Sequence, residues 1–263
     1  MDYSYAANLM FQTSFEEDNN LLAPDRKESP IWWQDFNHTT IKVQGEKALF
    51  QMIVKSSNLH KFMENRIEIT EARDGNKTHA LHQIIKKKEE EWTQNAYIVD
   101  TEGKEQKRLY IRYSLRFPKN LSELLGRDSW LVLSEYKTLT DYRLAFYVYS
   151  DEHKKLYWYV HGDNVVIDNT PYKEYWFREN RKVPVPQGEW MEIEIFWERG
   201  KHGRVWLNVD GERVLNYEGR TKLLDPIRFI MFFTNYAKTP IDQWIDNIEI
   251  WDDYPCDGKK SCY

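Results

Sequence analysis

Hydrophobic and polar residues alternate along much of the chain, most clearly in the stretch LYIRYSLRF. Because successive side chains of a β-strand point to opposite faces, residues two apart share a face. One face of this stretch is apolar throughout and carries Leu109, Ile111, Tyr113, Leu115 and Phe117. The other face carries Tyr110 together with Arg112, Ser114 and Arg116. The pattern predicts a strand over 109–117 with one face in a hydrophobic core.

Similar short stretches recur through the sequence and predict a protein made mainly of strands. They are Ile41–Val43, Ala48–Val54, Arg66–Thr70, Trp130–Lys137, Tyr142–Tyr149, Leu156–Val160, Trp190–Trp197, Arg204–Val209, Ile227–Phe233 and Trp244–Trp251. Turn-forming residues separate several of them, at Asp74-Gly75-Asn76, Gly162-Asp163-Asn164 and Asp210-Gly211. The last pair lies between VWLNV and ERVLNY, which is typical of a tight β-hairpin.

Patterns typical of helices are scarce. The stretch Gln83–Trp92 contains the charge run KKKEEE and predicts either a solvated helix or an irregular loop. Residues Lys119–Leu125 follow Pro118 and predict one helical turn. With no repeat and no low-complexity linker, we expect one domain over 1–263, with N-terminal strands within 1–55 and a C-terminal strand at 244–252 in the same sandwich. Many short strands separated by turns indicate an all-β fold of two antiparallel sheets.

Composition narrows the classes of partner. Hydrophobic residues make up 41% of the 263 residues, which is enough to bury a sizeable core. Both signs of charge are interspersed and the net charge is −5, so we do not expect nucleic acid as a partner. Aromatic residues reach 15%, with 11 Trp and 17 Tyr. Their flat apolar faces and polar edges suit stacking on sugar rings, although many are expected to fill the core instead.

The sequence also bears on cellular location. It has no apolar run of the roughly 18 residues that a membrane span needs, and the first residues MDYSY show no signal peptide. The two cysteines, Cys256 and Cys262, have no further metal ligands nearby and predict a disulfide that closes the tail 253–263. A disulfide indicates an oxidising compartment, so we expect a secreted or periplasmic protein whose leader has been removed. Two free thiols in a cytosolic protein are the alternative.

Several segments resemble, in the same order, strands of a known fold. They are LYIRYSLRFP (109–118), WLVLSEYK (130–137), LYWYVHGDN (156–164), the hairpin segment 188–214 and QWIDNIEIWD (243–252). They are similar to the concanavalin-type β-jelly-roll of heparin-lyase-like and glucuronan-lyase-like polysaccharide lyases, over about Arg66 to Asp252. The hairpin and the last strand also occur in laminarinase-type hydrolases, so they specify the fold better than the chemistry. The resemblance implies β-elimination on an acidic, uronic-acid-containing polysaccharide in a concave groove.

A lyase of this kind needs a group that neutralises the substrate carboxylate, a base for the C5 proton and an acid for the leaving oxygen. The resembled lyases carry a Gln-aromatic-His/Lys triplet on the concave sheet, and this chain has Glu135-Tyr136-Lys137 at that place. Alternation puts Glu135 and Lys137 on one face. Lys137 suits a catalytic role, but an ionised Glu135 cannot neutralise another carboxylate. We expect Glu135 to hold Lys137 or a sugar hydroxyl; a solvent-facing salt bridge is the alternative.

The resemblance implies further catalytic residues. Arg66-Ile67-Glu68 resembles an Arg-x-Glu signature in which the arginine grips the substrate carboxylate with two hydrogen bonds. Tyr236 stands where such lyases carry a strand-end tyrosine that transfers protons. His82, three residues after His79, is a candidate base, although a pair of loop histidines without function is an alternative.

A second group of residues is expected to bind substrate without transferring protons. Lys238 and Arg143 carry positive charge that would lower the pKa of Tyr236. Tyr159 and His161, at the end of the strand LYWYV, are expected to contact the polysaccharide near the groove mouth. No cofactor is expected for the chemistry itself.

Other acidic residues invite different interpretations. The run Glu192–Glu198 resembles the paired carboxylates of glycosidases, but alternation predicts Ile193, Ile195 and Trp197 in the core and the glutamates outside. No cluster with zinc spacing occurs. Glu16 and Asp246, at the two chain ends, are the expected ligands of a structural calcium ion.

The sequence leaves three functions open. A polysaccharide lyase is the first; a non-catalytic carbohydrate-binding or surface-glycan-binding jelly roll is the second, and a glycoside hydrolase the third. All three are expected to bind an acidic polysaccharide or oligosaccharide as monomers. A hydrolase would need two carboxylates about 5–10 Å apart across the groove, whereas a lyase would show convergent Arg, Lys and Tyr.

Overall fold

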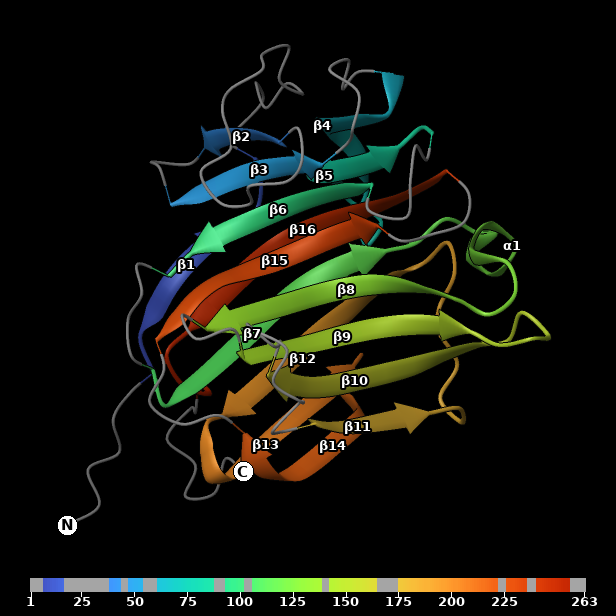
Figure 1. The fold of residues 1–263 in the computed structure, drawn as a ribbon. Coiled ribbons are helices and arrows are strands. Elements are labelled where there is room, and N and C mark those ends of the chain that lie inside the picture. The colour runs from blue at the N-terminus through green and yellow to red at the C-terminus, as the bar shows by residue number, and fades with distance from the viewer. Residues whose placement is uncertain are drawn as a thin grey trace.

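The computed structural model describes residues 7–16, 38–43, 47–53, 61–87, 93–101, 106–138, 142–164, 175–221, 226–235 and 240–255. These residues form two antiparallel sheets packed face to face, as Figure 1 shows. We call them sheet A and sheet B, and we call the face of each sheet that is turned away from the other its outer face. The all-β sandwich of two antiparallel sheets that the alternation predicts is confirmed, and it agrees with the jelly-roll type that the resemblance implies.

Sheet A runs in the order β14-β13-β12-β7-β16-β5-β4, and β1 also pairs with β16. Its strands are β1 (Leu9–Thr13), β4 (Met63–Glu71), β5 (Lys77–Ile85), β7 (Arg108–Arg116), β12 (Trp190–Glu198), β13 (Gly200–Val209), β14 (Glu212–Thr221) and β16 (Ile241–Trp251). Sheet A therefore joins strands from both ends of the chain.

Sheet B runs in the order β11-β10-β9-β8-β15-β6-β3-β2. Its strands are β2 (His38–Val43), β3 (Ala48–Ile53), β6 (Gln94–Asp100), β8 (Ser129–Thr138), β9 (Tyr142–Ser150), β10 (Leu156–Asn164), β11 (Tyr175–Asn180) and β15 (Ile227–Asn235). Strands β8, β9, β10 and β11 are consecutive antiparallel neighbours, so residues close in sequence meet on one part of this sheet.

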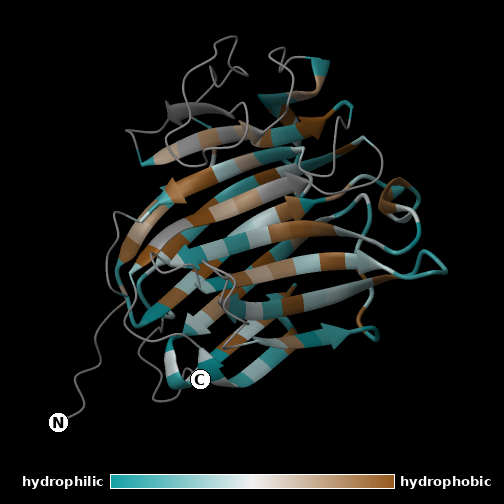
Figure 2. Cartoon of the chain, in the orientation of Figure 1, coloured by the Kyte–Doolittle hydropathy of each residue, from teal (hydrophilic) through white to brown (hydrophobic). Residues whose placement is uncertain are grey.

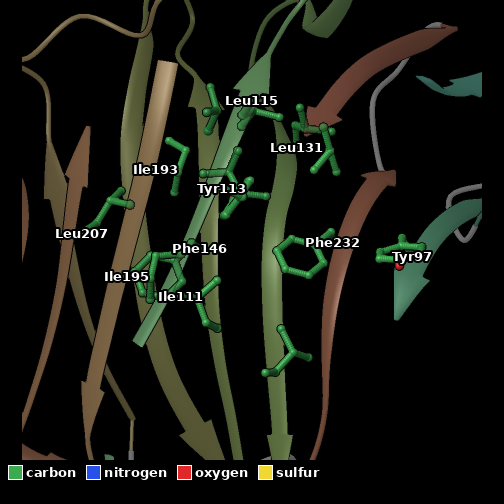
Figure 3. Packing of buried hydrophobic residues seen from close by; sticks show 14 of the residues in the cluster. Tyr97, Ile111, Tyr113, Leu115, Leu131, Phe146, Ile193, Ile195, Leu207 and Phe232 are labelled. Atoms are coloured by element: carbon green, nitrogen blue, oxygen red, sulfur yellow. The ribbon is translucent and has the colours of Figure 1, made fainter. Parts of the chain in front are cut away.

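The core between the sheets follows the alternation read from the sequence. Leu109, Ile111, Tyr113, Leu115 and Phe117 are all buried, with at most 1% of each side chain exposed. Figure 3 shows Ile111, Tyr113 and Leu115 of β7 among Phe146 of β9 and Phe232 of β15. In Figure 2, brown and teal positions alternate along many strands, because each strand buries only one face.

The local predictions are mostly confirmed. The predicted helical turn is α1 (Leu121–Leu125). The hairpin turn at Asp210 and Gly211 has positive φ at both residues, 52° and 78°, as a tight hairpin requires. The helical alternative for Gln83–Trp92 is wrong at its start, since residues 83–85 are the end of β5 and pair with β4 and β16. Within the described residues, no helix is long and apolar enough to cross a membrane.

Candidate active site on the outer face of sheet B

Strands β9 and β10 each divide their residues between the core and the outer face. Strand β9 buries Leu144, Phe146 and Val148 in the core, and β10 buries Trp158 and Val160 there. The residues between them face outward: Arg143, Ala145, Tyr147 and Tyr149 on β9, and Tyr157, Tyr159, His161 and Asp163 on β10. The sequence alternation therefore places titratable and aromatic side chains together on this face.

The strand register brings five ionisable side chains into contact on this outer face. Lys137, Arg143 and Asp163 lie opposite one another across β8, β9 and β10, and Glu135 and His161 flank Ala145 in the next row. Directly opposed residues of an antiparallel pair are about 4.5–5.5 Å apart at Cβ. We call Glu135, Lys137, Arg143, His161 and Asp163 the charged cluster.

Hydrogen bonds and ion pairs connect the charged cluster. Arg143 donates from Nε and Nη2 to the two oxygens of Asp163, at 3.1 and 2.8 Å. His161 Nε2 lies 3.2 Å from Asp163 Oδ2, and Lys137 Nζ lies 3.3 Å from Glu135 Oε1. Four of the five residues are buried, and Arg143 keeps 27% of its side chain exposed. Buried charges at these distances interact strongly, because little water screens them.

The electrostatics fix the charge of two members. Burial alone would raise the pKa of the Asp163 carboxyl, but hydrogen bonds from His161 and Arg143 outweigh burial and hold this pKa below 3.8. Burial would lower the pKa of the Arg143 guanidinium, yet the hydrogen bonds to Asp163 and the charge of Glu135 raise it overall. Asp163 is therefore a carboxylate and Arg143 a cation throughout the working pH range.

Tyr147 brings a hydroxyl to the charged cluster. Its oxygen lies 3.4 Å from His161 Nε2, and the two rings are 5.1 Å apart. An ionised carboxylate only accepts hydrogen bonds, so His161 Nε2 must carry the proton that it donates to Asp163. In the neutral imidazole this leaves Nδ1 as the basic nitrogen. His161 Nε2 therefore does not accept the Tyr147 proton.

Aromatic rings continue from the charged cluster towards β11. We call Trp130, Tyr149, Tyr157, Tyr159, Tyr175 and Phe177 the aromatic platform. Neighbouring rings are 4.7–6.1 Å apart: Tyr149 stacks on Trp130 and Tyr157, and Phe177 stacks on Tyr159. Tyr175 and Phe177 are exposed for 55% and 47% of their surface. Large exposed aromatic residues side by side are typical of ligand-binding surfaces.

The phenols of Tyr149, Tyr157 and Tyr159 are neutral, because the pKa of each is raised above its ordinary value. Burial raises the pKa of Tyr149 to about 12, and nearby Tyr157 adds to the shift. Burial and the hydrogen bond with Tyr175, whose hydroxyl lies 3.0 Å away, raise the pKa of Tyr159. These rings therefore offer apolar faces and neutral hydroxyls, which match the surface of a sugar.

The structure brings together five residues that the sequence had singled out. Glu135, Lys137, Arg143, Tyr159 and His161 all lie on the outer face of sheet B. The pairing of Glu135 with Lys137 is the one expected from alternation, but both are buried, so the solvent-facing alternative does not hold. Tyr236 and Lys238 lie outside the described residues.

Arg66 and His82 do not join this cluster, which corrects the expectation of one shared groove. Both belong to sheet A, where β4 and β5 pair with Arg66 directly opposite His82, and both face outward from that sheet. His82 Nε2 lies 2.8 Å from Asp242 Oδ2 and its Nδ1 lies 3.2 Å from Glu68 Oε2. The two sheets and the core therefore separate these residues from Lys137.

Sequence reasoning missed Asp163, Tyr147 and most of the platform. Gly162-Asp163-Asn164 was interpreted as a turn, but β10 continues through it to pair with β9 and β11. Gly162 is needed for packing: a Cβ there would lie 2.3 Å from the Tyr142 hydroxyl and 2.4 Å from Trp176 Nε1. The alternation Tyr157, Tyr159, His161, Asp163 was the available signal, and it extends the strand past the glycine.

The remaining acidic residues lie elsewhere. Ile193, Ile195 and Trp197 are buried in the core, as alternation predicts, and the glutamates between them face outward on sheet A. Glu16 and Asp246 do approach each other: Thr78 Oγ1 is 2.9 Å from an oxygen of each. No group of three or more His, Cys, Asp or Glu that could hold a metal occurs in the described part of the chain. Cys256 and Cys262 lie outside it.

Comparisons with known proteins agree on the fold. No protein-family model and no curated protein matches the chain. Among solved structures, the endo-β-1,4-glucuronan lyase of the fungus Trichoderma reesei is similar at 10% identity and a TM-score of 0.50, over 71% of this chain and 86% of that one. Alginate lyase AlyC3 in complex with dimannuronate matches at 13% identity and a TM-score of 0.49, over 73% and 90%. The likeness to the glucuronan lyase, at this low identity, shows a shared fold alone.

Proposed function

We propose that this protein is a polysaccharide lyase that cleaves a uronic-acid-containing polysaccharide on the outer face of sheet B. The observation that carries the proposal is the charged cluster, in which two cations, a histidine and a tyrosine hydroxyl meet beside exposed aromatic rings. A β-elimination requires these groups: positive charge at the substrate carboxylate, a base and an acid. The similarity in fold to a glucuronan lyase supports the assignment.

The cations would bind the substrate carboxylate. Asp163 holds Arg143 through Nε and Nη2, which leaves the Nη1 side of the guanidinium for a carboxylate of the substrate. Lys137 lies directly opposite Arg143 in the strand register, so both charges act on the same place. Neutralising that carboxylate makes the C5 proton acidic enough to be removed. Fixed charges in a site that excludes water are effective at this because they need no reorganisation.

His161 and Tyr147 would move the protons. The basic Nδ1 of His161 takes the C5 proton, and the C5–H electron pair forms the C4–C5 double bond as the bond from C4 to the leaving oxygen breaks. The Tyr147 hydroxyl gives its proton to that oxygen. Tyr236, the tyrosine suggested by resemblance, is the competing donor, and the two are distinguished by substitution below.

Non-catalytic carbohydrate binding is the second candidate. It is favoured by the ion pairs within the charged cluster. Lys137 lies against Glu135 and Arg143 lies against Asp163, so each of these two cations already has a carboxylate partner. A binding protein would use the aromatic platform alone, and substitutions of the charged cluster would change the stability of the fold and leave sugar affinity intact.

Product analysis tests the proposal. The protein is incubated with a panel of acidic polysaccharides, and the ultraviolet absorbance of the unsaturated product is followed. The lyase account predicts absorbance that rises with time on at least one polymer. Release of reducing ends without that absorbance would indicate a hydrolase, and binding without cleavage would indicate the second candidate. Two further proposals can be tested on the same sample. Mass spectrometry tests the Cys256–Cys262 disulfide, from which secretion is proposed, and metal analysis tests a calcium ion at Glu16 and Asp246.

A further inference from the structure

The charged cluster has a nearly balanced charge. Lys137 and Arg143 contribute two positive charges, and Glu135 and Asp163 contribute two negative charges at neighbouring positions. A substrate carboxylate would be the third anion beside two cations, because His161 is neutral when it acts as the base. The charged cluster therefore supplies no cation for a second uronate.

Among the described residues, the platform offers little compensation for further anions. Its surface consists of aromatic rings, and burial raises the pKa of the Tyr149 and Tyr159 phenols above its ordinary value. Arg181 lies in ring contact with the platform, with its Cζ 3.8 Å from the centre of the Tyr157 ring. Arg178, next to Phe177, has its Cζ 5.1 Å from the centre of the Tyr217 ring, which is not part of the platform. Arg181 is already paired with Glu179 at 2.9 Å and lies 3.7 Å from Asp151. Glu179 adds negative charge at this edge.

A polymer with a carboxylate on every sugar would bind weakly to such a surface. The sugar on the platform side of the one at Arg143 would bring its carboxylate over Tyr159, Tyr175 and Phe177. A carboxylate loses solvation there, and the described residues place no unpaired cation over these rings, which is unfavourable. A neutral sugar has apolar C–H faces and hydroxyl groups, which match exposed rings and phenol hydroxyls.

We infer that the substrate is a polysaccharide in which each uronic acid has a neutral sugar next to it, rather than a homopolymer of uronic acid. The inference rests on the proposed function and specifies its substrate class. It also separates this chain from its structural neighbours, whose names refer to alginate and glucuronan. One uronate binds at Lys137 and Arg143, and the neutral sugar next to it lies on the aromatic platform.

A comparison of four polymers tests the substrate class. Hyaluronan alternates glucuronate with a neutral N-acetylated sugar, and deacylated gellan has one glucuronate among neutral sugars in each repeat. Polyglucuronate and alginate carry a carboxylate on every sugar. The expected kcat/KM and affinity are about tenfold higher for the best spaced polymer than for the homopolymers, which corresponds to about 1.4 kcal/mol.

The outcomes separate the inference from the proposed function. Equal or better binding and cleavage of polyglucuronate or alginate would overturn the inference and leave the lyase activity standing. A tenfold preference in binding without cleavage of any polymer would keep the substrate class and remove the lyase chemistry. Binding of none of the four would overturn both.

Adding a cation to the platform gives an independent test. Phe177→Lys places a positive charge where a flanking uronate would lie, and Phe177 is exposed enough to be replaced without loss of the fold. The affinity for polyglucuronate should rise several-fold relative to hyaluronan, and the gain should shrink with added salt. Ile69→Lys, at a 64% exposed position on sheet A, adds the same charge far from the platform and should change neither affinity. An unchanged ratio in Phe177→Lys, or an equal change in Ile69→Lys, would overturn the inference.

Discussion

The two outer faces of the sandwich use the same kinds of residue in different ways. On sheet A, Trp190, Arg116, Trp244, His82 and Arg66 lie opposite one another across five strands. Trp244 is stacked on His82 at 4.1 Å on one side and has Arg116 at 4.4 Å on the other, and Arg116 also lies 4.9 Å from the Trp190 ring. On sheet B, the rings at the β11 edge remain exposed.

The difference separates a stabilising surface from a candidate site. On sheet A, Arg116 covers Trp244 and lies against Trp190, and the Trp244 indole N–H donates to Glu68 at 2.6 Å. Cation–π contacts of this kind stabilise a fold by about 0.5–1 kcal/mol each at exposed positions. On sheet B, Lys137 is buried and Arg143 is half-buried, and the exposed rings next to them keep surface for a ligand. Residue type alone does not identify a site. A site is identified by side-chain surface that stays exposed after the contacts within the protein are made.

The largest expected effect comes from breaking the ion pair of sheet B. Arg143→Met leaves the buried Asp163 carboxylate without its bidentate partner, which should lower the free energy of unfolding by about 3 kcal/mol and abolish activity. Arg66→Met removes an arginine of sheet A that is 47% exposed and should cost no more than about 1 kcal/mol with activity unchanged. Urea unfolding of both variants measures the difference. Equal losses would show that the two faces do not differ as described.

Removal of one hydroxyl should affect turnover more than stability. Tyr147→Phe should reduce kcat by about 10²–10⁴-fold with little change in affinity, because proton transfer contributes in the transition state. Tyr217→Phe removes a hydroxyl on sheet A that makes a 3.4 Å bond to a backbone oxygen, and it should keep full activity. Tyr236→Phe is assayed beside them. If it loses turnover and Tyr147→Phe does not, the tyrosine implied by the resemblance is the acid and our assignment is wrong.

The two faces should also respond differently to acid. Burial raises the pKa of Asp246 on sheet A to about 6, above the ordinary 3.8. A raised pKa in the folded state means that the protonated carboxyl stabilises the fold, and this contribution is lost as the pH rises from about 4 to 6. It should amount to 1–2 kcal/mol as an order of magnitude.

The pKa of Asp163 on sheet B is shifted in the opposite direction. Its pKa lies below 3.8 in the folded state, so its contribution is full above pH 4 and is lost as the pH falls further. Thermal unfolding between pH 3 and 7 checks both: Asp246→Asn should flatten the curve between 4 and 6 and leave the acid limb below 4. An unchanged curve between 4 and 6 would contradict the raised pKa.

The smallest effect concerns the platform. Phe177→Ala should weaken polysaccharide binding by about 1 kcal/mol, roughly fivefold, because the ring is exposed and its loss disturbs little packing. Trp190→Ala on sheet A removes the contact with Arg116 and should lower stability without changing affinity. Calorimetric titration of the two variants with the same polymer shows which face binds it.

The sequence predicted which face of a strand each residue lies on better than it predicted which strands pair with one another. Alternation placed Leu109–Phe117 and the pair Glu135 and Lys137 correctly, because the face of a residue depends on its own strand. Arg66 was assigned from a three-residue motif that carries no information on which sheet β4 joins. That choice depends on pairing with β5 and, through it, with β16, far away in the sequence.

Asp163 shows a different limit. Glycine and aspartate side by side are typical of turns, and the local chemistry gave no reason to continue the strand. The strand continues because Tyr142 and Trp176, from the two neighbouring strands, occupy the space beside Gly162. Such packing depends on three strands at once and cannot be read from one of them.

A matched pair of histidine variants tests the central claim most directly, since His161 lies on the outer face of sheet B and His82 on that of sheet A. His161→Ala and His82→Ala are incubated with hyaluronan and gellan, each variant having first been shown to be folded by its near-ultraviolet spectrum, and the absorbance of unsaturated product is followed. The account predicts that wild type and His82→Ala produce it and that His161→Ala does not. Full activity in His161→Ala with loss of activity in His82→Ala would place the active site on sheet A and contradict the account.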